Sequence, residues 1–322
     1  DFNFNDNDVD IEFEDEALER PQPTLDDVIA ELRSGEGHLP GPTLLYGLSD
    51  LTPDQVDALQ PTWQGLEVTY RRVLMQMLVD AMESNYELDY TAFGMQGLHD
   101  SEPAVRQAAI EVLAENDSLR FMQQLMRMAT EDPAESVRIE AMRGLGRFVQ
   151  MSELGDLDDE SAQQVEGLVY DTLRHSDSQD MRRVALESIA HCSRLDVSDS
   201  IQAAYNSGKR DQQISALIAM GRTCEPRWSQ TVLDELENDD IAIRREAARA
   251  AGELQLADAV KLLARIVHED VREVQENAIW ALGEVASREA IRVLEAAAEM
   301  AEERGDEGML AQNDDGLGNE SL

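Results

Sequence analysis

The chain has 322 residues, of which 67 are acidic and 27 basic, and its net charge is −40. A field this negative repels nucleic-acid phosphate, so general binding of DNA or RNA is disfavoured and basic partners are favoured. The sequence has no run of 18 apolar residues, which excludes a transmembrane helix. The acidity suits solubility or a high-salt environment equally well, since only Lys209 and Lys261 are lysines.

The first 20 residues combine nine acidic side chains with Phe2, Phe4, Ile11 and Phe13. They show no period that would form a core. We therefore predict a disordered acidic tail over residues 1–20. It is either a plain solvated tail or a short binding motif of acids and aromatics.

Residues 24–85 are predicted to be helical. Thr24 and Thr52 are good N-caps, Pro53 suits a first helical position, and Pro61 is expected to restart the chain. The expected helices cover residues 25–33, 40–48, 53–59 and 63–83. This block lacks the repeat described next, so we interpret it as an N-terminal cap that covers the end of a stack.

Residues 87–286 contain six copies of one pattern, which is clearest in Ile241–Glu253, IAIRREAARAAGE. Each copy is aligned on an alanine, with an apolar residue four positions earlier in five copies and Gly or Ala five positions later. The aligned alanines are Ala109, Ala141, Ala185, Ala216, Ala247 and Ala278. Their spacings are 32, 44, 31, 31 and 31 residues, and an insertion near residues 151–160 accounts for the long one. A fixed period of this size predicts a solenoid of helical hairpins, because one hairpin alone cannot bury its apolar face.

Each copy is expected to form two helices. The first helices are predicted near residues 88–98, 118–130, 161–175, 197–207, 227–237 and 257–268. The second helices are predicted near residues 102–115, 135–149, 179–194, 210–223, 241–254 and 271–286. A C-terminal capping helix is expected within residues 287–304, followed by a disordered tail over residues 305–322. The predicted fold class is all-α, with about six helical hairpins between two caps.

The pattern Asp, a short gap, Val-Arg and then Ala-x-x-x-Leu-Gly resembles HEAT repeats over residues 87–286. It resembles most closely the short bacterial HEAT-like repeats that also occur in phycobilin lyases and deoxyhypusine hydroxylases. The resemblance implies a right-handed α-α superhelix, with the Asp in the turn and the Arg opening the second helix. The matching pairs are Asp100/Arg106, Asp132/Arg138, Asp177/Arg182 and Asp240/Arg244. Gln213 and Gln275 replace the Arg in copies four and six, so no continuous Asp–Arg ladder is expected there.

No metal or cofactor site is predicted. The iron-binding hydroxylases of the resembled group carry His-Glu pairs at the start of second helices. The matching positions are Gln107-Ala108, Ile139-Glu140, Arg183-Val184, Ile214-Ser215, Arg245-Glu246 and Glu276-Asn277. None is His-Glu, so that activity is not expected.

The histidines and cysteines suit structural roles. His99, His175 and His268 share one column at the ends of first helices, where free carbonyls favour a histidine. Cys192 and Cys224 are interpreted as small buried residues rather than a disulfide, which fits a reducing cytoplasm.

A strip of side chains at a spacing of four can be traced along each second helix. It consists of Gln107, Glu111, Glu115, Ile139, Arg143, Arg147, Arg183, Glu187, His191, Ile214, Ile218, Arg222, Arg245, Arg249, Glu253, Glu276, Trp280 and Glu284. The strip holds six Arg and six Glu, and second helices line the concave side of HEAT arrays. Its predicted protein-binding residues are Arg143, Arg147, Arg183, Ile218, Arg222, Arg245, Arg249 and Trp280, since Arg and Trp are frequent at energetic interface positions. Alternatively, the arginines pair with neighbouring glutamates and the apolar residues belong to the core.

The sequence therefore favours a non-catalytic, cytoplasmic protein-binding scaffold or adaptor. The alternative is a lyase- or chaperone-like maturation subunit for a cofactor or pigment protein, as in relatives of the repeat. A HEAT-like DNA glycosylase is disfavoured by the charge. The expected partner is a protein or peptide with an acidic or mixed extended segment, and the chain's own residues 1–16 are one candidate. Neither nucleic-acid binding nor membrane insertion is expected.

Overall fold

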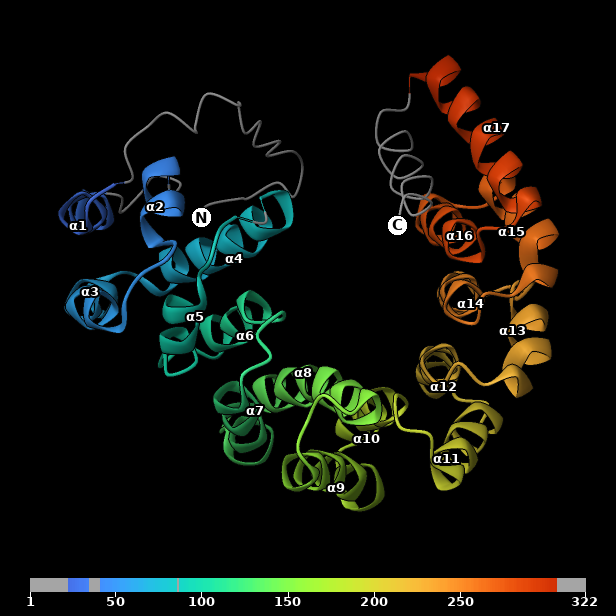
Figure 1. Cartoon of the computed structure of the whole chain (residues 1–322), viewed down its shortest axis with the longest axis horizontal. Helices are drawn as coiled ribbons and strands as arrows, with labels where there is room; N and C mark the ends of the chain where they lie inside the picture. The colour runs from blue at the N-terminus through green and yellow to red at the C-terminus, as the bar shows by residue number, and fades with distance from the viewer. Residues whose placement is uncertain (1–22, 35–40, 86, 306–322) are drawn as a thin grey trace. The chain divides into compact units, whose positions relative to one another are not determined.

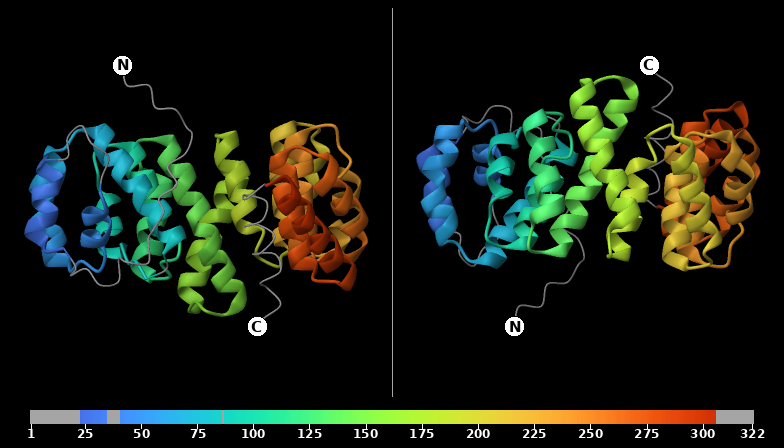
Figure 2. Two further views of the ribbon diagram at one scale, coloured as in Figure 1. Left: turned by 90° about the horizontal axis from the view of Figure 1, so that it is seen from above. Right: turned by 90° about the horizontal axis from the view of Figure 1, so that it is seen from below.

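The computed structural model describes residues 23–34, 41–85 and 87–305. Helices and turns make up these residues, and no β-strand occurs among them. The chain divides into two compact units, unit 1 up to Asn116 and unit 2 from Asp117 (Figure 1). In both views of Figure 2 the helices within each unit lie side by side, with their axes across the direction in which successive helices follow one another. No helix of the described part is long and apolar enough to cross a membrane.

Unit 1 contains six described helices. They are α1 (Leu25–Ser34), α2 (Pro42–Leu48), α3 (Pro53–Gly65), α4 (Val68–Ser84), α5 (Thr91–Gly97) and α6 (Pro103–Val112). Thr52 begins α3 with a capping box, in which Gln55 Oε1 accepts a hydrogen bond from the Thr52 backbone N–H at 2.8 Å. Thr24 accepts a hydrogen bond from the Asp27 backbone N–H at 3.3 Å. Both predicted N-cap residues, Thr24 and Thr52, therefore lie at the start of a helix.

The predicted break at Pro61 is wrong. Helix α3 continues through Pro61 to Gly65, and the chain turns at Leu66 and Glu67 instead. Proline removes one backbone hydrogen bond, which frees the carbonyl of Asp57 four residues earlier. Asp57 and Pro61 are both exposed, so water can satisfy that carbonyl and the helix persists.

Unit 2 continues the hairpin pattern. Its elements are α7 (Leu119–Glu131), α8 (Glu135–Leu154), α9 (Asp159–His175), α10 (Gln179–Ile189), α11 (Leu195–Asn206), α12 (Arg210–Arg222), η2 (Pro226–Trp228), α13 (Ser229–Glu235), α14 (Ile241–Glu253), η3 (Ala257–Ala259), α15 (Val260–Glu269), α16 (Arg272–Val285) and α17 (Arg288–Arg304). The all-α fold class is therefore confirmed, and the twelve predicted repeat helices each have a counterpart. The subdivision into a cap, six repeats and a capping helix stays a prediction. The predicted tails over residues 1–20 and 305–322 lie outside the described residues, except for Gly305, which ends α17.

The aligned alanines lie in the core. All six, from Ala109 to Ala278, are fully buried, as the repeat requires. The insertion between copies two and three lengthens helices rather than adding a loop. Helix α8 has 20 residues and α9 has 17, and Gly155 ends α8 in the left-handed conformation with φ of 82°.

The arginine that recurs at the start of several second helices holds the turn through backbone carbonyls. Arg106 Nη1 donates to the Asp100 carbonyl and Arg138 Nη1 to the Asp132 carbonyl, both at 2.8 Å. Arg244 donates likewise to Asn238 at 2.7 Å. Each arginine therefore closes the turn six residues before it, and this contact does not need an Asp side chain.

Carboxylates of the turns link neighbouring repeats. Asp240 accepts from Arg210 at 2.5 Å, and Asp270 accepts from Arg244 at 2.6 Å. A ladder of ion pairs thus joins copies four, five and six, although no ladder was expected at copies four and six. In copy four the arginine of this ladder is not in the Arg column, which holds Gln213. It is Arg210, three positions earlier.

Candidate functional site

The predicted protein-binding residues lie on one layer of unit 2. Helices α8, α10, α12, α14 and α16 contact one another in this order. Within this unit they form the inner layer, and α9, α11, α13 and α15 form the outer layer (Figure 1). The eight predicted residues from Arg143 to Trp280 all belong to the inner helices. We call these eight side chains together the strip face.

Arg143 and Arg147 of the strip face are held by carboxylates. Arg143 lies 3.3 Å from Glu187, and Arg147 lies 2.5 Å from Asp117. Such pairs fix the arginine side chains but leave a large part of each accessible, since Arg143 is 46% exposed.

Helix α14 supplies two further paired arginines. Arg245 lies 2.9 Å from Glu246 and 3.7 Å from Glu273, and Arg249 lies 2.8 Å from Glu253. Both arginines are half-buried. The pairing alternative therefore describes these side chains correctly, and whether they also bind a protein stays a prediction.

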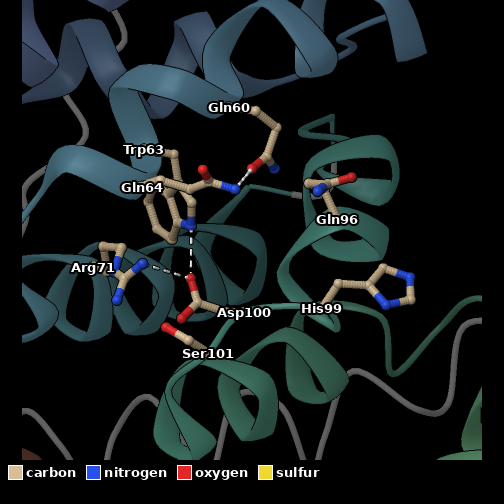
Figure 3. Close-up of a pocket in the computed structure, with 8 residues that line it drawn as sticks. All are labelled: Gln60, Trp63, Gln64, Arg71, Gln96, His99, Asp100 and Ser101. Atoms are coloured by element: carbon tan, nitrogen blue, oxygen red, sulfur yellow. Dashed lines mark hydrogen bonds and ion pairs between the residues drawn. The ribbon is translucent and has the colours of Figure 1, made fainter.

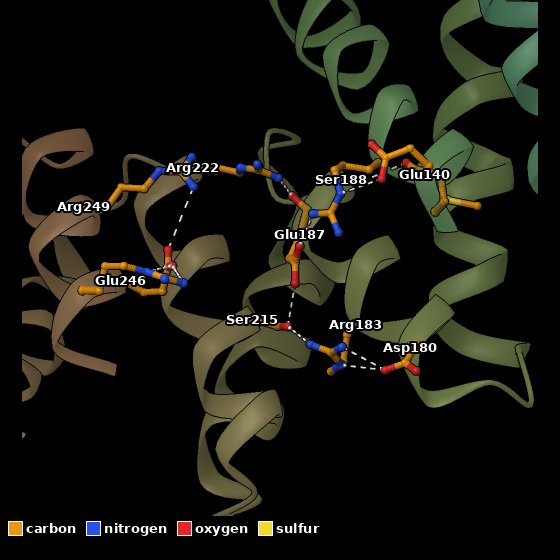
Figure 4. A network of polar contacts seen from close by, with 12 residues as sticks. Glu140, Asp180, Arg183, Glu187, Ser188, Ser215, Arg222, Glu246 and Arg249 are labelled. Atoms are coloured by element: carbon orange, nitrogen blue, oxygen red, sulfur yellow. Dashed lines mark hydrogen bonds and ion pairs between the residues drawn. The ribbon is translucent and has the colours of Figure 1, made fainter. Parts of the chain in front are cut away.

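Glu187 is the centre of a polar network on this face (Figure 4). Its side chain is buried, and its two oxygens receive Ser215 Oγ at 2.6 Å and Arg143 Nη1 at 3.3 Å. Ser215 Oγ also accepts from Arg183 at 3.3 Å. Arg222 reaches the same point from α12 and donates to the Glu187 carbonyl at 2.8 Å. Glu187 therefore joins three helices through one buried carboxylate.

A second group of partly buried ionisable side chains lies around Glu253. Burial raises the pKa of Glu253, and Arg249 and Arg222 oppose this shift. Burial also lowers the pKa of His191 to about 4, and Arg222 and Arg249 lower it further. His191 is therefore neutral near pH 7, because a proton on its ring would be buried beside two guanidinium groups.

Two glycines make room for the strip. A Cβ at Gly252 would lie 2.7 Å from Trp280 Cζ3 and 2.8 Å from Ala281 Cα, so the Trp280 ring lies against α14. A Cβ at Gly221 would likewise collide with the Glu253 carboxylate. The small-residue column of the repeat therefore accommodates side chains of the following helix as well as its backbone.

The apolar residues of the strip divide into two kinds. Trp280 is 40% exposed, whereas Ile139, Ile214 and Ile218 are half-buried. Trp280 is thus an exposed aromatic, while Ile218 contributes partly to the packing of α12.

The sequence reasoning missed Ser215 and Glu246, which are both buried in the network. Each directly precedes an aligned alanine, and Glu140 and Asn277 occupy the same column. Polar residues recurring beside a fully buried alanine were the available signal.

The histidines and cysteines do not form a metal site in the part of the chain that the structure describes, which holds no cluster of three potential ligands. His175 ends α9, and its Nδ1 lies 3.2 Å from the Asp171 carbonyl, as expected for a helix end. Cys192 and Cys224 are both free thiols. The expectation that both are buried is wrong for Cys224, which is exposed because the chain leaves α12 there with a positive φ of 51°.

A family model and the fold of a solved phycocyanin lyase complex agree with this architecture. A family model of HEAT repeats matches residues 92–172 and 229–307. No curated protein matches the chain. The solved complex of CpcE and CpcF of phycocyanin lyase from Nostoc sp. PCC7120 is similar, with 19% identity, a TM-score of 0.55, and coverage of 78% of this chain and 95% of that chain. Human deoxyhypusine hydroxylase, solved with glycerol, matches with 16% identity, a TM-score of 0.37, and coverage of 83% and 96%.

Proposed function

Because this chain is a HEAT-repeat protein, we propose that it is a non-catalytic scaffold that binds a protein partner on the strip face of unit 2. The observation that carries the proposal is Trp280, a large aromatic that remains 40% exposed on the face. It lies against Gly252, one turn along α14 from Arg249. An aromatic beside positioned arginines is the combination that dominates binding energy at many protein interfaces.

The chemistry of the face favours a partner with an extended acidic or mixed segment. Arg143, Arg245 and Arg249 are already oriented by carboxylates, so binding requires little further ordering of their side chains. A partner carboxylate can share these guanidinium groups, while an apolar side chain covers Trp280. The net charge of −40 makes a nucleic-acid partner unfavourable.

The chain's own residues 1–16 are one candidate for such a segment, although they lie outside the described residues. Deleting them is expected to change peptide binding by the strip face or the oligomeric state measured by light scattering. If both stay as in the full chain, the tail is not the occupant.

Residence in a reducing cytoplasm is part of the proposal. Two free thiols, one of them exposed, support it, because oxidising compartments favour disulfides.

Pull-down with variants of the full chain tests the scaffold. The variant Trp280→Ser with Arg249→Ala removes the exposed aromatic and one arginine of the strip face. Arg265→Ala is the matched control, since Arg265 is an exposed arginine of the outer helix α15 that pairs with Glu237 at 2.6 Å. We expect partners to be retained by the wild type and by Arg265→Ala, and to be lost with the double variant. Equal retention by all three would refute the strip face as the binding site.

The second candidate is a maturation subunit or lyase for a cofactor or pigment protein. This candidate is supported by the fold similarity to the CpcE–CpcF complex of phycocyanin lyase. It predicts one tightly bound apoprotein and a chromophore absorbance in the purified material. The scaffold predicts several partners and no absorbance beyond that of the protein.

A further inference from the structure

Unit 1 contains a cavity of about 390 Å³ that the strip face does not involve (Figure 3). Trp63 and two glutamines come from α3, Arg71 from the first turn of α4, and Gln96 and Asp100 from α5 and the turn after it. Its volume is at the lower end of that of small-ligand sites.

Asp100 is fixed at the wall of this cavity by three donors. Its Oδ2 accepts from Trp63 Nε1 at 2.8 Å and lies 3.1 Å from Arg71 Nη1. Its Oδ1 accepts from the Glu102 backbone N–H at 2.9 Å. The Asp100 side chain is only 2% exposed, so its orientation is set before any ligand arrives.

Arg71 is buried but incompletely satisfied. Its side chain is 7% exposed, and its Nε is buried without a hydrogen-bond partner. A guanidinium group has five N–H donors, and the ion pair with Asp100 engages Nη1. An acceptor atom that reaches Nε from the cavity would therefore meet a donor that has already lost its water.

The charges of the cavity select the class of ligand. Apart from His99 at the rim, its charged side chains are Arg71 and Asp100, which neutralise each other. A second anion would be repelled by Asp100 and a cation by Arg71. Gln60, Gln64 and Gln96 add amide groups that both donate and accept hydrogen bonds.

We propose that this cavity binds a neutral carboxamide group, as found in a peptide bond or in an Asn or Gln side chain. The carbonyl oxygen of the ligand accepts from Arg71, and its N–H donates to the remaining lone pair of Asp100. The glutamines of the rim complete the hydrogen bonds. The site does not depend on the proposed function of unit 2.

Titration of the ¹⁵N-labelled full chain tests the proposal, with the Trp63 indole signal as the sensor. Acetamide represents a side-chain amide and N-methylacetamide a peptide bond, while sodium acetate and methylammonium chloride represent the two charged classes. The Trp63 signal is assigned by its loss in Trp63→Phe. We expect a saturable shift in the millimolar range with at least one amide, and the arm that binds more tightly identifies the source. The absence of such a shift, or an equal shift with either charged probe at matched ionic strength, would overturn the proposal.

Rim variants locate the site without disturbing the buried pair. The double variant Gln60→Ala, Gln96→Ala is expected to weaken amide binding about tenfold, by loss of two hydrogen-bonding groups. Gln76→Ala is the control, since Gln76 is exposed on α4 and bonds Asp80. Equal binding by both variants would place the amide elsewhere.

Asp100→Asn tests the electrostatic argument. It leaves Arg71 as the unbalanced charge, so the preference is expected to change from amide to acetate. Retained preference for the amide in a folded variant would refute the charge selection. If this variant does not fold, the probe titration and the rim variants still decide the proposal.

Discussion

Unit 1 and unit 2 each bury charged side chains, but they hold them differently. In unit 1 the pair Arg71–Asp100 is almost fully enclosed, and Arg71 has no other charged partner among the described residues. In unit 2 Glu187 is equally buried, yet its partners Arg143 and Ser215 each have a second partner, Glu140 and Arg183. Removing Asp100 therefore leaves Arg71 without a counterion, whereas Arg143 and Ser215 each keep a second partner when Glu187 is removed.

The largest expected effect is that of Asp100→Ala. It leaves the Arg71 charge buried without a counterion, which is expected to lower the free energy of unfolding by about 3–5 kcal/mol. Urea unfolding of the full chain followed by circular dichroism measures it. The control Asp89→Ala removes only an exposed turn acceptor, which bonds the Thr91 N–H at 2.8 Å, and should lose about 1 kcal/mol. Similar losses in both variants would contradict the comparison.

Gly252→Ala tests how tightly the strip face of unit 2 is packed. The added methyl group meets Trp280 and the Ala281 backbone, so we expect a loss of about 2 kcal/mol and an altered Trp280 emission. Gly167→Ala in α9 is the matched control, because a Cβ there meets nothing within 4 Å. It is expected to gain about 0.5–1 kcal/mol through helix propensity. A gain in both variants would show that a methyl group fits between α14 and α16 without strain.

Glu187→Ala sharpens the comparison with Asp100→Ala. Arg143 can turn to Glu140 and Ser215 keeps Arg183, so the expected loss is about 1–2 kcal/mol despite equal burial. The measurement is the same urea titration. A loss as large as that of Asp100→Ala would mean that the substitutes do not act.

The smallest expected effect is a pH dependence from His191. Its pKa is about 4 in the folded chain and about 6.5 when unfolded, so the unfolded chain takes up the proton first as pH falls. This stabilisation is therefore present above pH 6.5 and lost between pH 6.5 and pH 4. The full difference between the two pKa values corresponds to about 3 kcal/mol. Because His191 is only half-buried and solvent screens part of its charge, the wild type should lose about 1 kcal/mol over this range relative to His191→Gln. The raised pKa of Glu253 acts in both proteins, so a difference that is flat with pH would show that His191 is not buried as described.

Most of the fold could be predicted from the sequence, because the same pattern of small and apolar buried residues recurs in each repeat. The alanine column and the apolar position before it identify the second helices, and the 31-residue period locates the first ones. Pro61 misled the prediction, since a proline inside a helix removes one hydrogen bond and crowds one carbonyl but does not always end the helix, and α3 continues through it. Cys224 misled it as well, because helix ends bring residues to the surface that a periodic pattern places inside.

Less of the candidate site could be predicted. The strip arginines follow from a spacing of four, but their carboxylate partners lie 44 residues away for Arg143 and 30 residues away for Arg147. The cavity of unit 1 was not predicted at all, because Trp63 and Arg71 belong to two different helices and Asp100 to the turn after α5, with no repeat pattern that relates the three. Only the folded chain brings them together.

Every basic residue of the strip face is an arginine, and the chain's two lysines lie elsewhere, Lys209 before α12 and Lys261 in the outer helix α15. Arginine stays charged at every physiological pH and is not a substrate for acetylation or ubiquitination. Enzymes that modify lysine therefore cannot alter the charge of this face. The same property makes Lys209 and Lys261 convenient points for attaching a dye or a solid support while the strip face stays unmodified.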